Sequence, residues 1–363
     1  MTVLLFIIGL VTLIVGAELF LKSVDKFGLA WSVSPVVMGL TVVAFATGAP
    51  ELAISLQAAA EGKPDLVLGN ILGSNIANIL LILGIAGLVK PLRITNRIIK
   101  IDVPVVIGAS ILLYVLAMDG LLTPVDGFII FGALVAYSIF MYSQIKKDRR
   151  DNKLKKEEQP ELDEPLTTLF YGKYIFLLLA GLVLIVMGSR WMVESAVEIA
   201  GILGISELII GLTIVSIGTS LPEVATSLSA VRRGDSDTAV ANVMGSNLYN
   251  ILLTLSLTII VAPGALDVSM DAIRLDLPFM VIVAVACLPL FWPAKELGRP
   301  EAVGFLFYYA AYMAYLVLIA MQNPYKETME WAMIWIIIPL TVLLIVIKFI
   351  TDYRKRKRGL ERS

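Results

Sequence analysis

Long apolar segments and short polar connections alternate along the chain. Eleven apolar segments, each of about 18 residues or more, are long enough to cross a lipid bilayer as helices. Their predicted bounds are 2–21, 34–60, 66–89, 101–118, 122–144, 172–190, 205–231, 237–262, 273–292, 302–321 and 330–350. The pattern therefore predicts an all-α polytopic membrane protein.

One polar stretch is much longer than the other connections. Residues 146–164, within the predicted linker 145–171, carry mixed charge and few apolar side chains, a composition typical of a solvated linker. We interpret it as a cytoplasmic tether between two five-span halves, residues 1–144 and 172–321, with a regulatory role as the alternative. Because five is odd, the second half enters the membrane from the opposite side, which predicts two inverted five-helix repeats. Residues 322–363 then add an eleventh helix and a basic cytoplasmic tail.

The second and third spans are near copies of the seventh and eighth. Residues 39–84 and 211–256 align without a gap, and 22 of the 46 aligned positions are identical. Each copy has a Pro-Glu pair in the middle of its first apolar segment. Each also has a Gly-Ser-Asn-x-x-Asn run in its second segment, at Gly73–Asn78 and Gly245–Asn250. The two copies support the inverted repeat and mark its functional centre.

Composition excludes several kinds of site. The chain is 58% hydrophobic and 16% charged, whereas soluble domains carry about 25% charged residues. It has no histidine, and its one cysteine, Cys287, lies inside a predicted span. A disulfide within the chain is therefore impossible, and a zinc site has almost no ligands. The first segment lacks a basic start and a small-residue cleavage site, so we expect a retained span.

The distribution of charge predicts the orientation. With eleven spans and the N-terminus outside, 25 of the 29 Lys and Arg residues lie inside, as the positive-inside rule requires. Omitting the eleventh span would place the basic residues that follow it outside. We therefore expect a multi-pass protein of the cell (inner) membrane, with the linker and the C-terminal tail in the cytoplasm.

Each repeat buries one carboxylate without a basic partner. Glu51 and Glu223 lie near the midpoints of their spans, where an ionised carboxylate costs about 3 kcal/mol or more. No Lys or Arg lies at that depth in spans two, three, seven or eight, so the partner must be a cation, a proton or water. Carbonyls freed at a helix break can also coordinate ions. The predicted helix-breaking residues are Gly48, Pro50, Gly218 and Pro222.

Neutral oxygens surround the two carboxylates. Ser74 and Asn78 are four residues apart and share a helix face, and Ser246 and Asn250 repeat the arrangement. The hydroxyl residues beside the breaks are Thr47, Thr219 and Ser220. An all-oxygen set suits hard cations, either Ca²⁺ with about six to eight ligands or Na⁺.

Three further pairs of polar residues occupy equivalent positions in the two repeats. We expect Asn70 and Asn242 either to pack between helices or to form interhelical hydrogen bonds, and Asp65 and Asp237 to be helix N-caps. The remaining pair, Asn75 and Asn247, is left open between cation ligands and interhelical hydrogen bonds. Small-residue faces, Gly69 with Gly73 and Ala241 with Gly245, predict close helix approach.

At these residues the sequence resembles the cation/Ca²⁺ exchanger superfamily, specifically the prokaryotic Na⁺/Ca²⁺ exchangers. That family carries two repeats with a Gly-Thr-Ser-x-Pro-Glu core. The second repeat here, Gly218–Glu223, matches it fully, and the first, Ala46–Glu51, matches it in part. Gly48 stands where the family has serine, which leaves the number of Na⁺ ions in question. Asn250 stands where some relatives have aspartate, which argues against K⁺ dependence.

The resemblance implies a ligand set. A central Ca²⁺ would be held by Glu51, Glu223 and the carbonyls of Thr47 and Thr219, with Asn78 and Asn250 completing the centre. The implied Na⁺ ligands are Ser74, Ser220, Ser246 and the carbonyls of Ala44 and Ser216. Ca²⁺ and Na⁺ are then transported substrates, with no cofactor and no nucleic-acid partner, and a monomer would suffice.

The sequence thus predicts a Na⁺/Ca²⁺ antiporter that works by alternating access around a midplane dicarboxylate site. Spans one and six lack deep charges and carry Gly16 and Gly188 at equivalent positions, so we expect them to slide. H⁺/Ca²⁺ exchange is the alternative. A passive channel is disfavoured because no filter motif is present. An enzyme is disfavoured because the carboxylates lack a nucleophile–base pair.

Overall fold

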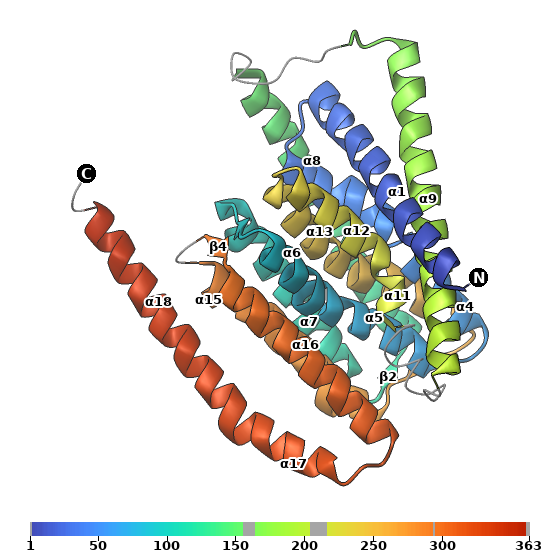
Figure 1. The fold of residues 1–363 in the computed structure, drawn as a ribbon, viewed down its shortest axis with the longest axis vertical. Helices are drawn as coiled ribbons and strands as arrows, with labels where there is room; N and C mark the ends of the chain where they lie inside the picture. Colours follow the sequence, from blue (N-terminus) through green and yellow to red (C-terminus); the bar gives the residue numbers. More distant parts are fainter. Residues whose placement is uncertain (1, 155–163, 204–215, 293–294, 361–363) are drawn as a thin grey trace.

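The protein forms a bundle of long helices, and Figure 1 shows the computed structural model. The structure describes residues 2–154, 164–203, 216–292 and 295–360. Within these residues, nine helices are long and apolar enough to span a membrane, or ten if one bent pair counts as one span. The predicted span 205–231 begins outside the described residues. The all-α fold predicted from the hydrophobic pattern is confirmed.

The first half contains five spans. The first is α1 (Thr2–Trp31), and the second is α2 (Pro35–Met38), η1 (Gly39–Val43), α3 (Ala44–Thr47) and α4 (Ala49–Ala60). The third is α5 (Pro64–Ala77), η2 (Asn78–Ile82) and α6 (Leu83–Val89), followed by strand β1 (Leu92–Arg93). The fourth is η3 (Ile98–Asp102) with α7 (Val103–Ala117), and strand β2 (Leu121–Leu122) leads into the fifth, α8 (Pro124–Leu154).

The second half follows the same order. It begins with α9 (Thr168–Ile202), and the described part of its second span is α11 (Ser216–Thr219) and α12 (Leu221–Arg232). Next come α13 (Ser236–Tyr249), η5 (Asn250–Leu255), α14 (Ser256–Val261) and strand β3 (Leu266–Asp267). The last core elements are η6 (Ala272–Asp276), α15 (Leu277–Phe291), strand β4 (Glu296–Leu297) and α16 (Arg299–Ala320).

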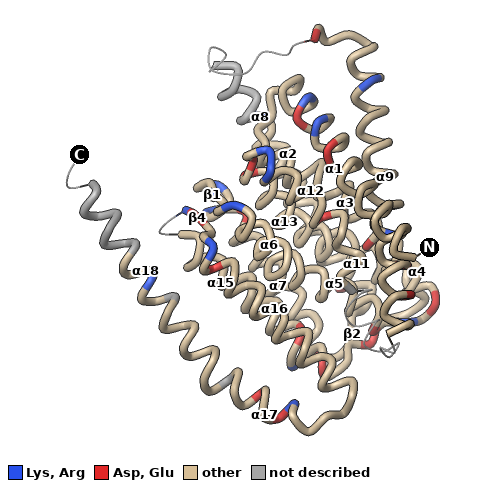
Figure 2. The backbone as a smooth tube through the Cα atoms, in the orientation of Figure 1, with Lys and Arg blue, Asp and Glu red and all other residues tan. Residues whose placement is uncertain are grey.

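Two short antiparallel strand pairs join the halves. Strand β1 pairs with β4, and β2 pairs with β3, at opposite ends of the bundle (Figure 1). Exchanging the two halves converts β1 into β3 and β4 into β2, so one pair becomes the other. This relation requires a two-fold axis across the bundle, which is the symmetry of an inverted repeat. Most charged residues lie toward the two ends (Figure 2).

Glycines bring α1 and α9 into backbone contact. A Cβ added at Gly16 would lie 2.8 Å from the carbonyl oxygen of Gly181, and one at Gly188 would lie 2.5 Å from the nitrogen of Leu13. Such close approach is typical of small-residue helix pairs in membranes. The two helices, blue and green in Figure 1, lie side by side and form one unit at the edge of the bundle.

A second close crossing lies between the repeats. A Cβ at Gly245 of α13 would lie 2.7 Å from the Ala44 Cβ, and one at Gly39 would lie 2.8 Å from the Ala241 Cβ. The small-residue prediction is therefore confirmed for Ala241 and Gly245. It is not supported at Gly69, because no described heavy atom lies within 4 Å of a Cβ built there.

The eleventh span is peripheral, as expected. It consists of α17 (Tyr325–Ala332), η7 (Met333–Ile337) and α18 (Ile338–Leu360), and its apolar side chains are largely exposed. Polar contacts with α16 attach it to the bundle. Tyr308 donates a hydrogen bond to Thr341 Oγ1 at 2.5 Å, and Lys348 forms an ion pair with Glu301.

Candidate functional site

Both repeats break their second span at the same place. Helix α3 ends at Thr47, and Gly48, with φ −78° and ψ 0°, separates it from α4. The axes on the two sides of this break differ by 42°. In the second repeat Ser220 has nearly the same backbone angles, φ −88° and ψ 4°, before α12 begins. Proline within the first two positions of the following helix fixes each restart.

The predicted breaking residues take different places at these junctions. Pro50 and Pro222 open the new helices, as expected. Gly48 is the junction residue itself, whereas its structural counterpart is Ser220 rather than Gly218. Gly218 lies inside α11, and its carbonyl accepts a hydrogen bond from Ser189 Oγ of α9 at 3.1 Å.

Glu51 and Glu223 occupy the first turns of α4 and α12. Both are 1% exposed, and the two carboxylates are close enough to repel one another. The positive end of a helix dipole favours an anion in this position. One oxygen of each carboxylate, Oε2, has no hydrogen-bond partner among the described residues. The breaks therefore aim two acids from opposite repeats at one buried region.

Other buried oxygens share this lack of a partner. Most buried polar atoms in proteins are hydrogen-bonded, and leaving one without a partner costs about 1–3 kcal/mol. Within the described part of the chain, the exceptions include five of the neutral side chains predicted for the site. They are Ser74 Oγ, Asn78 Oδ1, Ser220 Oγ, Ser246 Oγ and Asn250 Oδ1. An all-oxygen set of this kind fits a hard cation.

The predicted threonine and backbone-carbonyl ligands differ from one another in burial and in hydrogen bonding. The Thr47 hydroxyl donates to the Val43 carbonyl at 3.1 Å and also interacts with the Glu223 carboxylate. Thr219 is half-buried at the end of α11. The Ala44 carbonyl accepts a hydrogen bond from the Gly48 amide at 3.1 Å. Its oxygen has a second lone pair that can coordinate a cation. Ser216 begins α11, and its side chain lies outside the described residues.

The supporting asparagines form the expected interhelical bonds. Asn70 donates to the Glu51 carbonyl at 3.2 Å and to Ser55 Oγ at 2.9 Å. Asn242 donates to Thr226 Oγ1 at 3.1 Å and Ser227 Oγ at 3.0 Å. The sequence analysis did not single out Ser55 and Ser227, which accept these bonds. Their identity at equivalent positions of the two copies was the signal that could have identified them.

The N-cap prediction for Asp65 and Asp237 is wrong. Lys63 is the residue that precedes α5, because Pro64 takes the first helical position. In α13 the cap is Asp235, whose Oδ1 accepts the Thr238 amide hydrogen at 2.9 Å. Both predicted residues instead lie in the first turn, where a negative charge complements the helix dipole.

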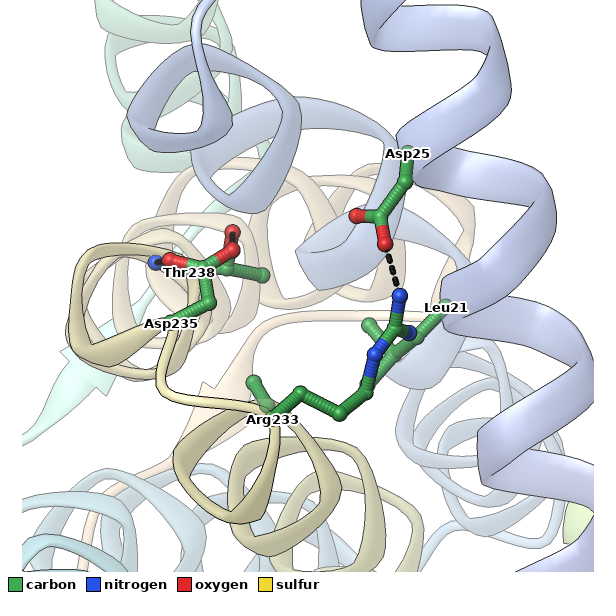
Figure 3. A pocket seen from close by; sticks show the side chains of 6 residues that line it. Leu21, Asp25, Arg233, Asp235 and Thr238 are labelled. Carbon is green, nitrogen blue, oxygen red and sulfur yellow. Dashed lines mark hydrogen bonds and ion pairs between the residues drawn. The ribbon is translucent and has the colours of Figure 1, made fainter. Parts of the chain in front are cut away.

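A small cavity of about 100 Å³ lies where α1 meets the ends of α12 and α13. Figure 3 shows Asp25 of α1 forming an ion pair with Arg233, which follows α12. The other lining residues are Leu21, Ala230, Asp235 and Thr238. Gly234 lies between the lining residues Arg233 and Asp235, and a Cβ built there would be 3.8 Å from Nζ of Lys90, which lies two residues before β1 in the chain. The cavity is therefore at the end of the bundle near β1. The ion pair therefore joins α1 to the helix that carries Glu223.

Within the described residues, no group of three or more acidic, cysteine or histidine side chains could hold a metal ion. A fixed transition-metal centre therefore has no ligand cluster in this part of the chain. The candidate site instead combines two acids with neutral oxygens, which is suited to ions that bind and leave.

Comparisons with known proteins identify relatives of the chain. The chain is 36% identical to the "Putative antiporter CaxA" of Alkalimonas amylolytica over 86% of this chain and 97% of that protein. It is 32% identical to "Inner membrane protein YrbG" of Escherichia coli strain K12, over 84% and 95%.

The fold also matches a solved exchanger. A structure of the sodium-calcium exchanger NCX_Mj superposes with a TM-score of 0.72 and 28% identity, covering 87% of this chain and 98% of that one. The sequence profile described as "Sodium/calcium exchanger protein" matches residues 1–143 and 173–318. The match covers both repeats and supports cation/Ca²⁺ exchange across a membrane. The chain therefore belongs to the sodium/calcium exchanger family.

Proposed function

We propose that this protein is a secondary active antiporter that exchanges Na⁺ for Ca²⁺ by alternating access around a central dicarboxylate site. One observation carries the proposal: Glu51 and Glu223 are buried together, and five of the neutral side chains predicted around them have an oxygen that lacks a hydrogen-bond partner within the described residues. Two acids neutralise one Ca²⁺, so the loaded carrier can change between its outward-facing and inward-facing states without a net charge at the site.

The same charge balance explains why transport would be an exchange. When the site is empty, two carboxylates repel one another in a medium of low dielectric. The carrier then changes state slowly until a cation returns. Na⁺ and Ca²⁺ compete for overlapping oxygens, so entry of one ion on one side accompanies release of the other. The ligands in this proposal are the residues that the family resemblance implies, including the carbonyls of Thr47 and Thr219.

We propose that α1 and α9 move together against the remaining helices. Their glycine contacts make them one unit, and Ser189 connects α9 to α11, just before the second helix break. The orientation predicted from charge places the Asp25–Arg233 pair on the cytoplasmic side. In that position the pair holds α1 against the core on the predicted inner side.

A flux assay tests the proposed coupling. In proteoliposomes that contain the purified protein, an outward Na⁺ gradient is expected to drive uptake of radiolabelled Ca²⁺. A K⁺ gradient and a pH gradient without Na⁺ are expected to drive none. Uptake driven by the pH gradient alone would contradict Na⁺ coupling and support H⁺/Ca²⁺ exchange. Liposomes without protein provide the control for leak.

The alternative, H⁺/Ca²⁺ exchange, rests on Gly48 and on the paired carboxylates. Gly48 has no hydroxyl where the second repeat has Ser220, so the first repeat offers one oxygen fewer to Na⁺. Closely spaced carboxylates such as Glu51 and Glu223 can also exchange protons. The pH-gradient arm of the flux assay separates this function from Na⁺ coupling.

Gly48→Ser should add the missing oxygen. Its backbone angles already match those of Ser220, and a Cβ at Gly48 would lie 3.9 Å from Asn250 Oδ1. We expect a lower half-saturating Na⁺ concentration and a Hill coefficient for Na⁺ that rises by up to about one. The measurement is Ca²⁺ flux against Na⁺ concentration.

The matched control for this variant is Gly48→Ala, which adds the same Cβ without a hydroxyl. A Cβ at Gly48 would also lie 3.1 Å from the Ala44 carbonyl, so both variants test the same steric change. If serine and alanine shift the Na⁺ dependence equally, the hydroxyl is not a ligand.

A further inference from the structure

An asparagine can bind a cation only through one end of its amide. The oxygen Oδ1 carries lone pairs, whereas Nδ2 carries two hydrogens with positive partial charge. The two ends have nearly the same shape, so neighbouring hydrogen bonds must select the orientation. Asn78 is 1% exposed at the start of η2 and is one of the proposed ligands. What fixes its amide therefore affects cation binding directly.

The neighbour that contacts this amide is Asn247, from the other repeat. Asn247 lies in α13, directly after Ser246, and is 1% exposed. Its Nδ2 donates to the backbone carbonyl of Asn75 at 3.2 Å. Its Oδ1 accepts from Asn78 Nδ2 at 2.9 Å. Both ends of the Asn247 amide are thus used, each by a different residue of the first repeat.

The backbone carbonyl determines the direction of the whole chain of bonds. A carbonyl can only accept a hydrogen bond, so the Asn247 end that faces Asn75 must be the Nδ2 end. The opposite end is then Oδ1, which also only accepts. Asn78 must therefore present Nδ2 to Asn247 and turn Oδ1 away from it. That oxygen has no partner among the described residues.

We infer that Asn247 is a positioning residue for cation binding: it orients the Asn78 amide so that Oδ1, and not Nδ2, faces the transported ion. The inference rests on the proposed cation site and adds a residue that acts through a ligand. Partners that orient ligands in this way typically change metal affinity by about 10- to 100-fold when removed.

The repeat symmetry supplies a natural comparison. Asn75 is the counterpart of Asn247, yet its Nδ2 donates to the Ile71 carbonyl within its own helix at 2.8 Å. Its amide group therefore does not orient Asn250 in the way that Asn247 orients Asn78. The two site asparagines are equivalent in sequence but held differently, so the same substitution should have different consequences in the two repeats.

The test measures Ca²⁺ binding by calorimetry on the purified full-length protein, together with its thermal stability. Asn247→Ala is expected to raise the Ca²⁺ dissociation constant at least about tenfold. Asn78→Ala and the double variant should then bind Ca²⁺ equally weakly, because Asn247 acts only through Asn78. Asn75→Ala should have a smaller effect that adds to that of Asn78→Ala.

A second background distinguishes positioning from a general packing role. The Asn78→Asp variant has no amide nitrogen to turn away, and Asn247 Oδ1 would then face a carboxylate oxygen. In this background Asn247→Ala is expected not to weaken Ca²⁺ binding, and to improve it if repulsion is relieved. Equal losses in the wild-type and Asn78→Asp backgrounds, or additive losses with Asn78→Ala, would overturn the positioning role.

These outcomes can be separated from those for the proposed function. If the flux assay shows coupling to H⁺ instead of Na⁺ while Ca²⁺ binding persists, the proposed coupling ion is wrong and the binding cycle still decides the role of Asn247. If Na⁺-driven flux stands but the cycle is additive, only the positioning role fails. Absence of Ca²⁺ binding by the wild-type protein would overturn both.

Discussion

Replacing either central carboxylate by its amide, Glu51→Gln or Glu223→Gln, is expected to abolish Ca²⁺ exchange. Both side chains are 1% exposed, so water cannot compensate for the lost negative charge. A bound Ca²⁺ would then carry an uncompensated positive charge in a region of low dielectric. Breaking a buried ion pair costs about 3–5 kcal/mol, which corresponds to a loss of at least about 100-fold in affinity.

Flux of radiolabelled Ca²⁺ in proteoliposomes checks this result, with the amount of folded protein matched between samples. Glu61→Gln is the control, because Glu61 is an exposed loop residue paired with Lys63 at 2.6 Å. Glu51→Asp and Glu223→Asp keep the charge and should retain partial activity. Normal flux by both amide variants would show that the site is misplaced.

A cleavable crosslink between α1 and the core is expected to stop exchange completely. Asp25 and Arg233 lie on opposite sides of the proposed moving boundary and form an ion pair. Replacing both by cysteine and joining them with a bis-methanethiosulfonate reagent holds α1 against the core. If α1 must move in each cycle, the exchange rate falls to background, and a reducing agent restores it.

The control crosslink joins the two halves without touching α1 or α9. Arg93 and Glu296 are opposite residues of the β1–β4 pair, where Cα atoms are about 5 Å apart and a disulfide is compatible. We expect Arg93→Cys/Glu296→Cys to form a disulfide and to transport normally. If the Asp25–Arg233 crosslink forms and exchange continues, α1 does not move relative to α12.

Hydrophobic length and charge predicted most of the fold. A membrane leaves few options for the backbone, so long apolar runs specify helices, and an odd number of spans per half specifies inversion. The strand pairs were not predicted, because two-residue strands such as Leu92–Arg93 have no periodicity to detect. The N-cap error at Asp65 arose because Pro64 had already taken the first helical position.

The site was predicted as residue types but not as an arrangement. The free-energy cost of an ionised carboxylate in an apolar span is enough to single out Glu51 and Glu223, since such a group needs a partner. The orientation of Asn78 could not be predicted, because it depends on Asn247 and a backbone carbonyl brought together across the two repeats. The ion pair of Asp25 likewise joins residues 208 positions apart, and neither residue is unusual by itself.

The π-helical segments bear on the origin of the two repeats. A π turn holds one residue more than an α turn, so it marks a single-residue insertion in a helix. Segments η2 and η5 begin at equivalent positions, Asn78 and Asn250. The same insertion in both halves indicates that it preceded the duplication that created them. Each five-span half carries only half of the proposed ligands, so a half alone could complete a site only by pairing with a second copy inserted upside down.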